Sequence, residues 1–98
     1  MKRLACGVLL ALLAHGAFAA DMIKGGQIYR MHCASCHGAS GVSAMPNAPS
    51  FARGERLTQP DQMLLGSIRR GRGAMPGFFG VLSDRDTLDV IAYLRSMR

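Results

Sequence analysis

Residues 33–37 read Cys33-Ala34-Ser35-Cys36-His37. Two cysteines three positions apart near the end of a helix present both sulfurs on one side of a single turn, and the next residue, His37, can turn its imidazole toward the same side. This spacing suits haem attachment, because it supplies two thiols for the two vinyl groups and one nitrogen for the iron. The sequence therefore predicts one haem c, bound covalently through Cys33 and Cys36 and ligated by His37.

Three other interpretations of the two cysteines are weaker. A thioredoxin-like redox pair needs a βαβ context, which the sequence does not indicate. A structural zinc site needs four ligands, and no second Cys or His pair accompanies Cys33 and Cys36 in the rest of residues 20–98. A disulfide between the two would close a loop too short to stabilise the chain much. Haem attachment remains the preferred interpretation.

The iron of such a site needs a sixth ligand or an open position. His32 lies on the attachment side, next to Cys33, so a second histidine ligand is disfavoured. Met75 lies in a glycine-rich loop between two predicted helices that could place its thioether across the far face, and we predict it as the ligand. Met45, eight residues after His37, and an open iron remain as alternatives. The methionines at helical positions are interpreted as packing residues: Met22, Met31, Met63 and Met97.

The first 19 residues have the layout of a secretory signal peptide. Lys2 and Arg3 give a positive start, residues 4–14 are apolar, and Ala17-Phe18-Ala19 provides small residues around a cleavage point. The apolar run is shorter than the roughly 20 residues that span a bilayer, so an uncleaved anchor is the weaker interpretation. The sequence predicts a signal peptide over 1–19, a cytochrome-sized domain over 20–98 and a periplasmic location, with Cys6 discarded in the leader.

Removal of this leader changes the composition of the chain. The 98 residues carry a net charge of +6, and subtracting Lys2 and Arg3 from the 12 basic side chains leaves 10 against 6 acidic ones, a net +4 over residues 20–98. This mild charge predicts no nucleic-acid binding, and we expect a monomer with no membrane insertion after cleavage. A domain of this size buries little surface and usually needs a cofactor or disulfide to complete its core.

Three helices are predicted in the domain. The first runs from Met22 to about Cys36; the second runs from Pro60 to Arg70, with Pro60 at the first helical position after Thr58 or Gln59. The third runs from Asp84 to Met97 behind a cap at Ser83. No convincing strand pattern accompanies them, so the predicted fold class is all-α.

With these elements placed, the chain resembles a family: the class I, monohaem, His/Met cytochromes c of the small bacterial periplasmic type. The resemblance covers nearly all of residues 20–98. Its elements occur in the family's order, with the attachment motif near the start of the domain. They are Gly25 and Tyr29 on the first helix, Cys33-Ala34-Ser35-Cys36-His37, Pro49, Met75-Pro76, and Val90 and Tyr93 on the last helix.

The resemblance implies a cytochrome c fold, with three main helices wrapped around one covalent haem. It implies that the Pro49 carbonyl accepts a hydrogen bond from the second nitrogen of His37, and that Met75 is the distal ligand. It also implies that Gly25 and Tyr29 cross the last helix. The residues expected to bury the haem are Phe51, Leu57, Leu64, Leu65, Ile68, Phe78, Phe79 and Leu82.

The function that the resemblance implies is that of a one-electron carrier between periplasmic respiratory redox proteins, not an enzyme. The alternative is a haem-bearing accessory or assembly protein for a periplasmic reductase, such as a haem-cd-type nitrite reductase. Transfer would occur at a small docking patch, formed by Ala34, Ser35, Met75, Pro76 and Gly77. Several arginines could contact the haem propionates, steer an acidic partner or simply face solvent: Arg53, Arg56, Arg69, Arg70 and Arg72.

Overall fold

The structure, a computed structural model, describes residues 19–98. Its helices in chain order are α1 (Met22–His32), α2 (Ala34–His37), the 3₁₀ helix η1 (Phe51–Arg53), α3 (Asp61–Arg70) and α4 (Asp84–Ser96). Residues 19–98 contain no strand, only two isolated β-bridges. The predicted all-α class and its three main helices are therefore confirmed. Nearly all of the predicted signal peptide lies outside the described residues.

The first predicted helix is divided in two at Cys33. Asp21 caps α1 by accepting a hydrogen bond from the Lys24 amide at 2.9 Å. Cys33 ends it with φ −119°, while its own amide still donates to the Tyr29 carbonyl at 2.9 Å. The chain then resumes as the single turn α2. Because of this break, the side chains of α2 do not continue the helical face by which α1 packs against the core.

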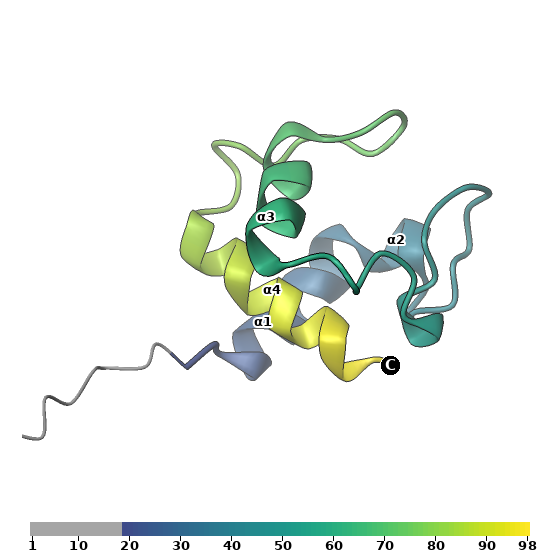
Figure 1. Cartoon of the computed structure of the whole chain (residues 1–98), viewed down its shortest axis with the longest axis horizontal. Coiled ribbons are helices and arrows are strands. Elements are labelled where there is room, and N and C mark those ends of the chain that lie inside the picture. Colours follow the sequence, from purple (N-terminus) through teal and green to yellow (C-terminus); the bar gives the residue numbers. More distant parts are fainter. Residues whose placement is uncertain (1–18) are drawn as a thin grey trace, which may run out of the picture.

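Helices α1 and α4 cross at very close range (Figure 1). A side chain at Gly25 would overlap the backbone carbonyl of Asp89 on α4, so only glycine allows the two backbones to approach this closely. Tyr29, on the same side of α1, is fully buried, and its ring lies 5.4 Å from that of Tyr93. The predicted crossing is thus present, although its closest contact, the Asp89 backbone, was not predicted.

The start of α1 is also joined to α4 by a hydrogen bond. The Asp21 amide donates to the carboxylate of Asp89 at 2.9 Å, and Asp89 is only 1% exposed. A carboxylate so deeply buried requires polar partners, because an unpaired one would strongly destabilise the fold. This bond fixes the point at which the described chain enters the folded domain.

Helix α3 begins one residue later than predicted. Pro60 adopts an extended ψ of 157° and lies at the N-cap, not at the first helical position. Arg95 of α4 holds this segment: its guanidinium donates to the Leu57 carbonyl at 2.6 Å and the Gln59 carbonyl at 2.9 Å, and contacts Asp61 at 2.7 Å. The chain between η1 and α3 is therefore fastened to α4.

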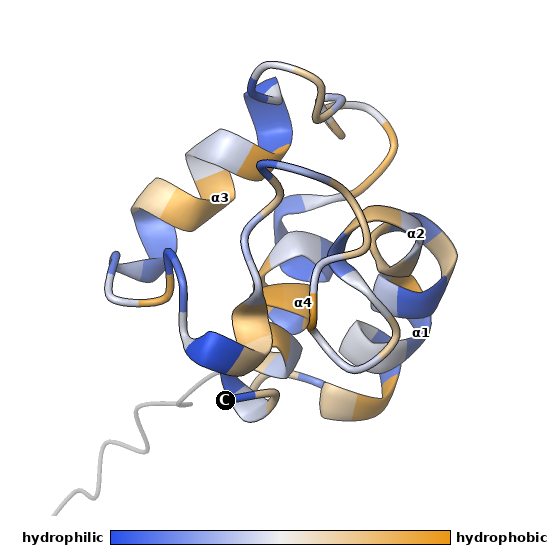
Figure 2. Cartoon of the chain, turned by 90° about the vertical axis from the view of Figure 1, so that its right-hand side faces the viewer, coloured by the Kyte–Doolittle hydropathy of each residue, from blue (hydrophilic) through white to orange (hydrophobic). Residues whose placement is uncertain are grey.

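Helix α4 matches its predicted start. Ser83 and Asp86 form a capping box in which each side chain accepts a hydrogen bond from the other residue's backbone amide. Both α3 and α4 have hydrophobic and hydrophilic stretches, as amphipathic helices do (Figure 2).

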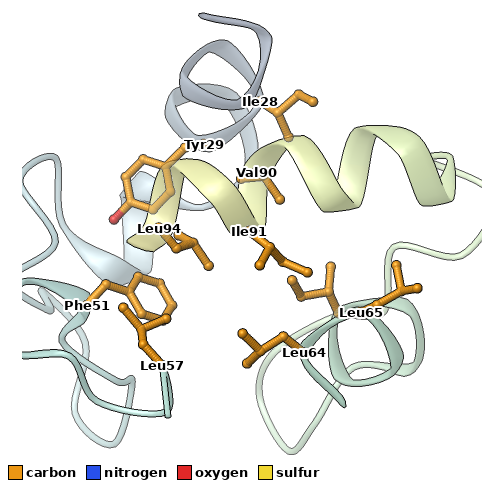
Figure 3. Close-up of a cluster of buried hydrophobic side chains, with 10 residues drawn as sticks. Ile28, Tyr29, Phe51, Leu57, Leu64, Leu65, Val90, Ile91 and Leu94 are labelled. Carbon is orange, nitrogen blue, oxygen red and sulfur yellow. The ribbon is translucent and has the colours of Figure 1, made fainter. Parts of the chain in front are cut away.

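The hydrophobic core is built from four segments. Side chains of α1, η1 and the residues after it, α3 and α4 project toward a common interior (Figure 3). Its buried members are Ile28, Tyr29, Phe51, Leu57, Leu64, Leu65, Ile68, Val90, Ile91 and Leu94. Five of the eight residues expected to bury a haem belong to this core. The attachment motif and the Met75 loop adjoin it, because Cys33, Ala34 and Met75 pack against it.

Candidate haem-binding site

The two cysteines lie at the turn between α1 and α2. The amides of Cys36 and His37 donate to the Cys33 carbonyl at 3.2 and 3.0 Å, so a single helical turn spans the two thiols. Both cysteines are free and half-buried. Burial, with a smaller contribution from Cys36, raises the pKa of the Cys33 thiol to about 11. A thiol that is neutral near pH 7 does not suit a redox pair, which needs a reactive thiolate.

His37 is fixed by two contacts. Its Nδ1 lies 3.0 Å from the Pro49 carbonyl oxygen, which can only accept, so Nδ1 carries the proton and donates. The ring also stacks on Phe51 with centroids 4.5 Å apart. His37 is 7% exposed. In the neutral imidazole this bond leaves the lone pair of the other nitrogen, Nε2, free for a metal, and the two contacts fix the ring.

Two residues that the sequence analysis missed hold Pro49 in place. The Ser50 amide donates to the Glu55 carboxylate at 2.8 Å, and the Ser50 hydroxyl accepts from the Ser43 amide at 3.0 Å. Ser50 is buried. No local pattern in the sequence marks Ser50 or Glu55, because their role arises only when residues 43–55 fold back on themselves.

Tyr29 braces the end of the attachment turn. Its hydroxyl donates to the Gly38 carbonyl at 2.6 Å in a buried environment. Burial raises the pKa of Tyr29 to about 12, with a smaller contribution from Cys33. The aromatic residue predicted to pack against α4 therefore has a second role, since it ties α1 to the residue that follows His37.

Met75 lies in a loop with a closed stem. The backbones of Arg72 and Met75 form two reciprocal hydrogen bonds of 3.0 Å. Gly71 has φ +77°, and a side chain on it would clash with the Gly77 amide nitrogen and the Met75 carbonyl. Met75 is half-buried against the hydrophobic core. The loop thus keeps a thioether at the core surface.

Met45 has different surroundings. It is 43% exposed and lines an open hollow of about 740 Å³ between residues 42–50 and Arg53, Glu55 and Arg56. Pro49 also lines this hollow, but Cys33 and Cys36 do not. Of the two loop methionines, Met75 is the one that packs against the hydrophobic core.

The structure corrects two predictions about apolar side chains. Phe78 and Leu82 are half-buried, but Phe79 is 74% exposed and lies under the Arg69 guanidinium, 5.3 Å from its ring centroid. Successive residues of an extended segment point to opposite sides, so Phe78 faces inward and Phe79 outward. Of the four helical methionines, only Met97 packs against the core; the others are exposed, namely Met22, Met31 and Met63.

The predicted docking patch is accessible. Ala34 and Met75 are half-buried, while Ser35, Pro76 and Gly77 are exposed. Arg69 is half-buried and paired with Asp84 at 3.1 Å. The remaining arginines of the predicted set are exposed: Arg53, Arg56, Arg70 and Arg72.

This donor set fits a c-type haem. Such a haem uses two thiols, a histidine nitrogen and a thioether. The structure supplies two free thiols one turn apart, a histidine with one nitrogen hydrogen-bonded to a carbonyl and the other free, and a thioether at the core surface. A different metal centre is less suited, since no three His, Cys, Asp or Glu side chains within residues 19–98 cluster as metal ligands.

Comparison with known proteins identifies the family to which the chain belongs. Residues 20–94 match the family model described as "Cytochrome C oxidase, cbb3-type, subunit III". Cytochrome c6 of Thermosynechococcus vestitus is 32% identical over 96 residues, which cover 91% of this chain and 84% of that protein. Cytochrome c6 of Picosynechococcus is 33% identical over 108 residues, covering 96% and 92%.

Two further comparisons extend the likeness. Cytochrome c4 of Pseudomonas aeruginosa is 36% identical over 100 residues, which cover all of this chain but 50% of that protein. The crystal structure of cytochrome c6 from the diatom Phaeodactylum tricornutum has a TM-score of 0.66 and 28% identity, covering 79% of this chain and 93% of its own. The chain therefore belongs to the c-type cytochrome family, and its cofactor is one haem c bound through Cys33 and Cys36.

Proposed function

We propose that this protein is a one-electron carrier whose haem iron is ligated by His37 and Met75. The observation that carries the proposal is the hydrogen bond from His37 Nδ1 to the Pro49 carbonyl, which fixes the ring and would leave Nε2 available to hold the iron of a haem attached at Cys33 and Cys36. The half-buried Met75, packed against the core, supports the choice of the second ligand. When bound, the haem supplies an iron that changes between its ferric and ferrous states.

The proposed residues would make this change rapid and keep other chemistry out. A histidine fixed by Pro49 and stacked on Phe51 has little freedom to move when the charge on its ligated metal changes. Met75 provides a soft sulfur that favours the ferrous state and raises the reduction potential. With both residues bound, no coordination position is left for a substrate, so we propose no enzymatic activity.

The proposed setting is the periplasm, with redox proteins as donor and acceptor. In support, residues 1–19 have the pattern of a signal peptide, and none of the helices in residues 19–98 has the length and hydrophobicity to cross a membrane. N-terminal sequencing of the protein from a periplasmic fraction tests this setting. We expect the first residue to be Ala20; a chain that still begins at Met1 would contradict the proposed export.

The ligand assignment is tested by Met75→Ala, with Met45→Ala as a matched control. The oxidised wild-type protein should show the near-infrared absorption band of a methionine sulfur bound to ferric haem iron. Met75→Ala should abolish this band and lower the reduction potential, whereas Met45→Ala should leave both unchanged. Loss of the band in Met45→Ala alone would refute the assignment. Rapid carbon monoxide binding by the wild-type ferrous protein would instead favour an accessory or enzymatic role.

A further inference from the structure

His32 makes a contact between two parts of the chain that are distant in sequence. It is the last residue of α1, directly before Cys33, and its imidazole is half-buried. Its ring meets that of Phe78 edge to face, with centroids 5.6 Å apart and planes inclined by 69°. Phe78 lies three residues after Met75. The contact therefore joins the attachment turn to the loop that carries the proposed distal ligand.

The backbone of this loop is fastened to a different helix. The Phe78 amide donates to the Ile68 carbonyl at 2.9 Å, and the next amide, that of Phe79, donates to the Arg69 carbonyl at 3.1 Å. Both acceptors belong to α3. The main chain thus ties the stem of the loop to α3, while the Phe78 side chain reaches the end of α1.

The tip of the loop has little support of its own. Residues 72–74 and 76–77 are exposed, and the reciprocal bonds between Arg72 and Met75 stay within the loop. Ligation of one iron by both Met75 and His37 would require the α3 side of the molecule to stay close to the attachment turn. The ring contact between His32 and Phe78 holds these two parts of the chain together.

We propose that His32 is a positioning residue that holds the Met75 loop closed over the attachment turn through its ring contact with Phe78. This inference rests on the proposed ligation by Met75. It assigns His32 no bond to iron, because its neighbour Cys33 is itself an attachment residue and its ring is turned against Phe78. What matters is the aromatic ring, and its loss would make the loop open more often.

The test follows loop opening in the oxidised, haem-bearing protein. Added imidazole replaces a methionine ligand only when the ligand moves away, so the rate of loss of the near-infrared band at saturating imidazole reports opening. An edge-to-face aromatic pair contributes enough that His32→Ala should raise this rate roughly 2- to 12-fold. His32→Phe, which keeps a ring, should restore a rate close to that of the wild type.

A double-mutant comparison separates the ring contact from general destabilisation. In a Phe78→Leu background, His32→Ala should have no further effect on the imidazole rate. An unchanged rate in His32→Ala, or an equal increase in both backgrounds, would overturn the inference. If the alanine variant does not mature, His32→Gln replaces it, since glutamine is polar but has no ring. Failure of this inference is distinguishable from failure of the proposed function, which depends only on the band in Met75→Ala.

Discussion

Tyr29 shows how one side chain serves two contacts at once. Its ring fills the crossing of α1 and α4 beside Tyr93, while its hydroxyl reaches the carbonyl of Gly38 at 2.6 Å. The first role was predicted through the family resemblance, which implies that Gly25 and Tyr29 cross the last helix. The sequence could not predict the second, which depends on the break at Cys33 that brings Gly38 back toward α1.

The buried hydroxyl of Tyr29 predicts a specific dependence of stability on pH. Its pKa in the folded protein is raised to about 12, above the ordinary value of about 10. A raised pKa means that the folded state favours the protonated form, so the contribution is complete below pH 10 and is lost as the pH rises from 10 toward 12. Measuring the free energy of unfolding from pH 8 to pH 11.5 tests this.

Tyr29→Phe is the comparison that isolates this group from other groups that titrate at high pH. At pH 8 the variant should be less stable than the wild type by about 1 kcal/mol, because the Gly38 carbonyl loses its donor. The difference should shrink above pH 10, since only the wild type carries the ionisable phenol. A difference that stays constant from pH 8 to pH 11.5 would contradict the assignment.

Among the elements, the close crossing of α1 and α4 requires a glycine at position 25. A methyl group at Gly25 would overlap the backbone of Asp89, which cannot move without separating the helices. Gly66 of α3 provides the contrast, because its methyl group would meet only the end of the Arg70 side chain, at 2.9 Å. The two glycines are both interior helix positions, yet only one of them lies at a helix crossing.

These two glycines give a matched pair of substitutions. Gly25→Ala should lower the free energy of unfolding by about 3 kcal/mol or prevent folding, because it overpacks a backbone contact. Gly66→Ala should raise it by up to about 1 kcal/mol, since alanine favours the helix and the Arg70 side chain can swing aside. Urea unfolding followed by circular dichroism measures both changes. Equal effects of the two substitutions would show that the crossing is not tight.

The extent of sequence-based prediction differs among the elements for a physical reason. Helices 22–32, 61–70 and 84–96 were predictable because caps and apolar spacing are local signals. Phe79 was wrongly placed in the core because the direction of a loop side chain is set by tertiary contacts, here the bond from its amide to the Arg69 carbonyl. Pro60 was wrong by one position because its ψ, which the ring does not fix, turned out extended.

The same distinction applies to the candidate site. The attachment motif could be predicted because its spacing lies within one turn. The role of Pro49 was predicted through the family resemblance, and the hydrogen bond from His37 to its carbonyl matches that prediction. The sequence could not predict the hydrogen bonds made by Ser50, Glu55 and the carboxylate of Asp89, because the partners come close only when the chain folds. The structure adds an observation to the choice between Met45 and Met75, because only Met75 packs against the core.

Across the whole molecule, the cofactor and the hydrophobic core would occupy adjoining space. The core draws on α1, η1, α3 and α4, and the attachment turn and Met75 border it, so a haem joined to Cys33 and Cys36 would be part of the interior. A domain of about 80 residues buries too little apolar surface to be stable by a wide margin. The haem is therefore expected to contribute to folding as well as to electron transfer.

Removing the covalent attachment tests this contribution. The double variant Cys33→Ala, Cys36→Ala should retain less helix by circular dichroism than the wild type and should bind a hydrophobic dye, because its interior is incomplete. Ser35→Ala, which changes the exposed residue between the cysteines, is the control and should behave as the wild type. A double variant with undiminished helix content and a sharp thermal transition would show that the chain alone suffices.

The bond between the Asp21 amide and the buried carboxylate of Asp89 has a consequence for biogenesis. If the leader is removed after Ala19, as the sequence predicts, only Ala20 lies between the scissile bond and the Asp21 amide that α4 holds. A protease binds its substrate in an extended conformation. Once α1 has packed against α4, the hydrogen bond at Asp21 leaves few residues near the cleavage point free to extend. We therefore expect cleavage to be easiest before α1 packs against α4, because afterwards the Asp21 amide is held by Asp89.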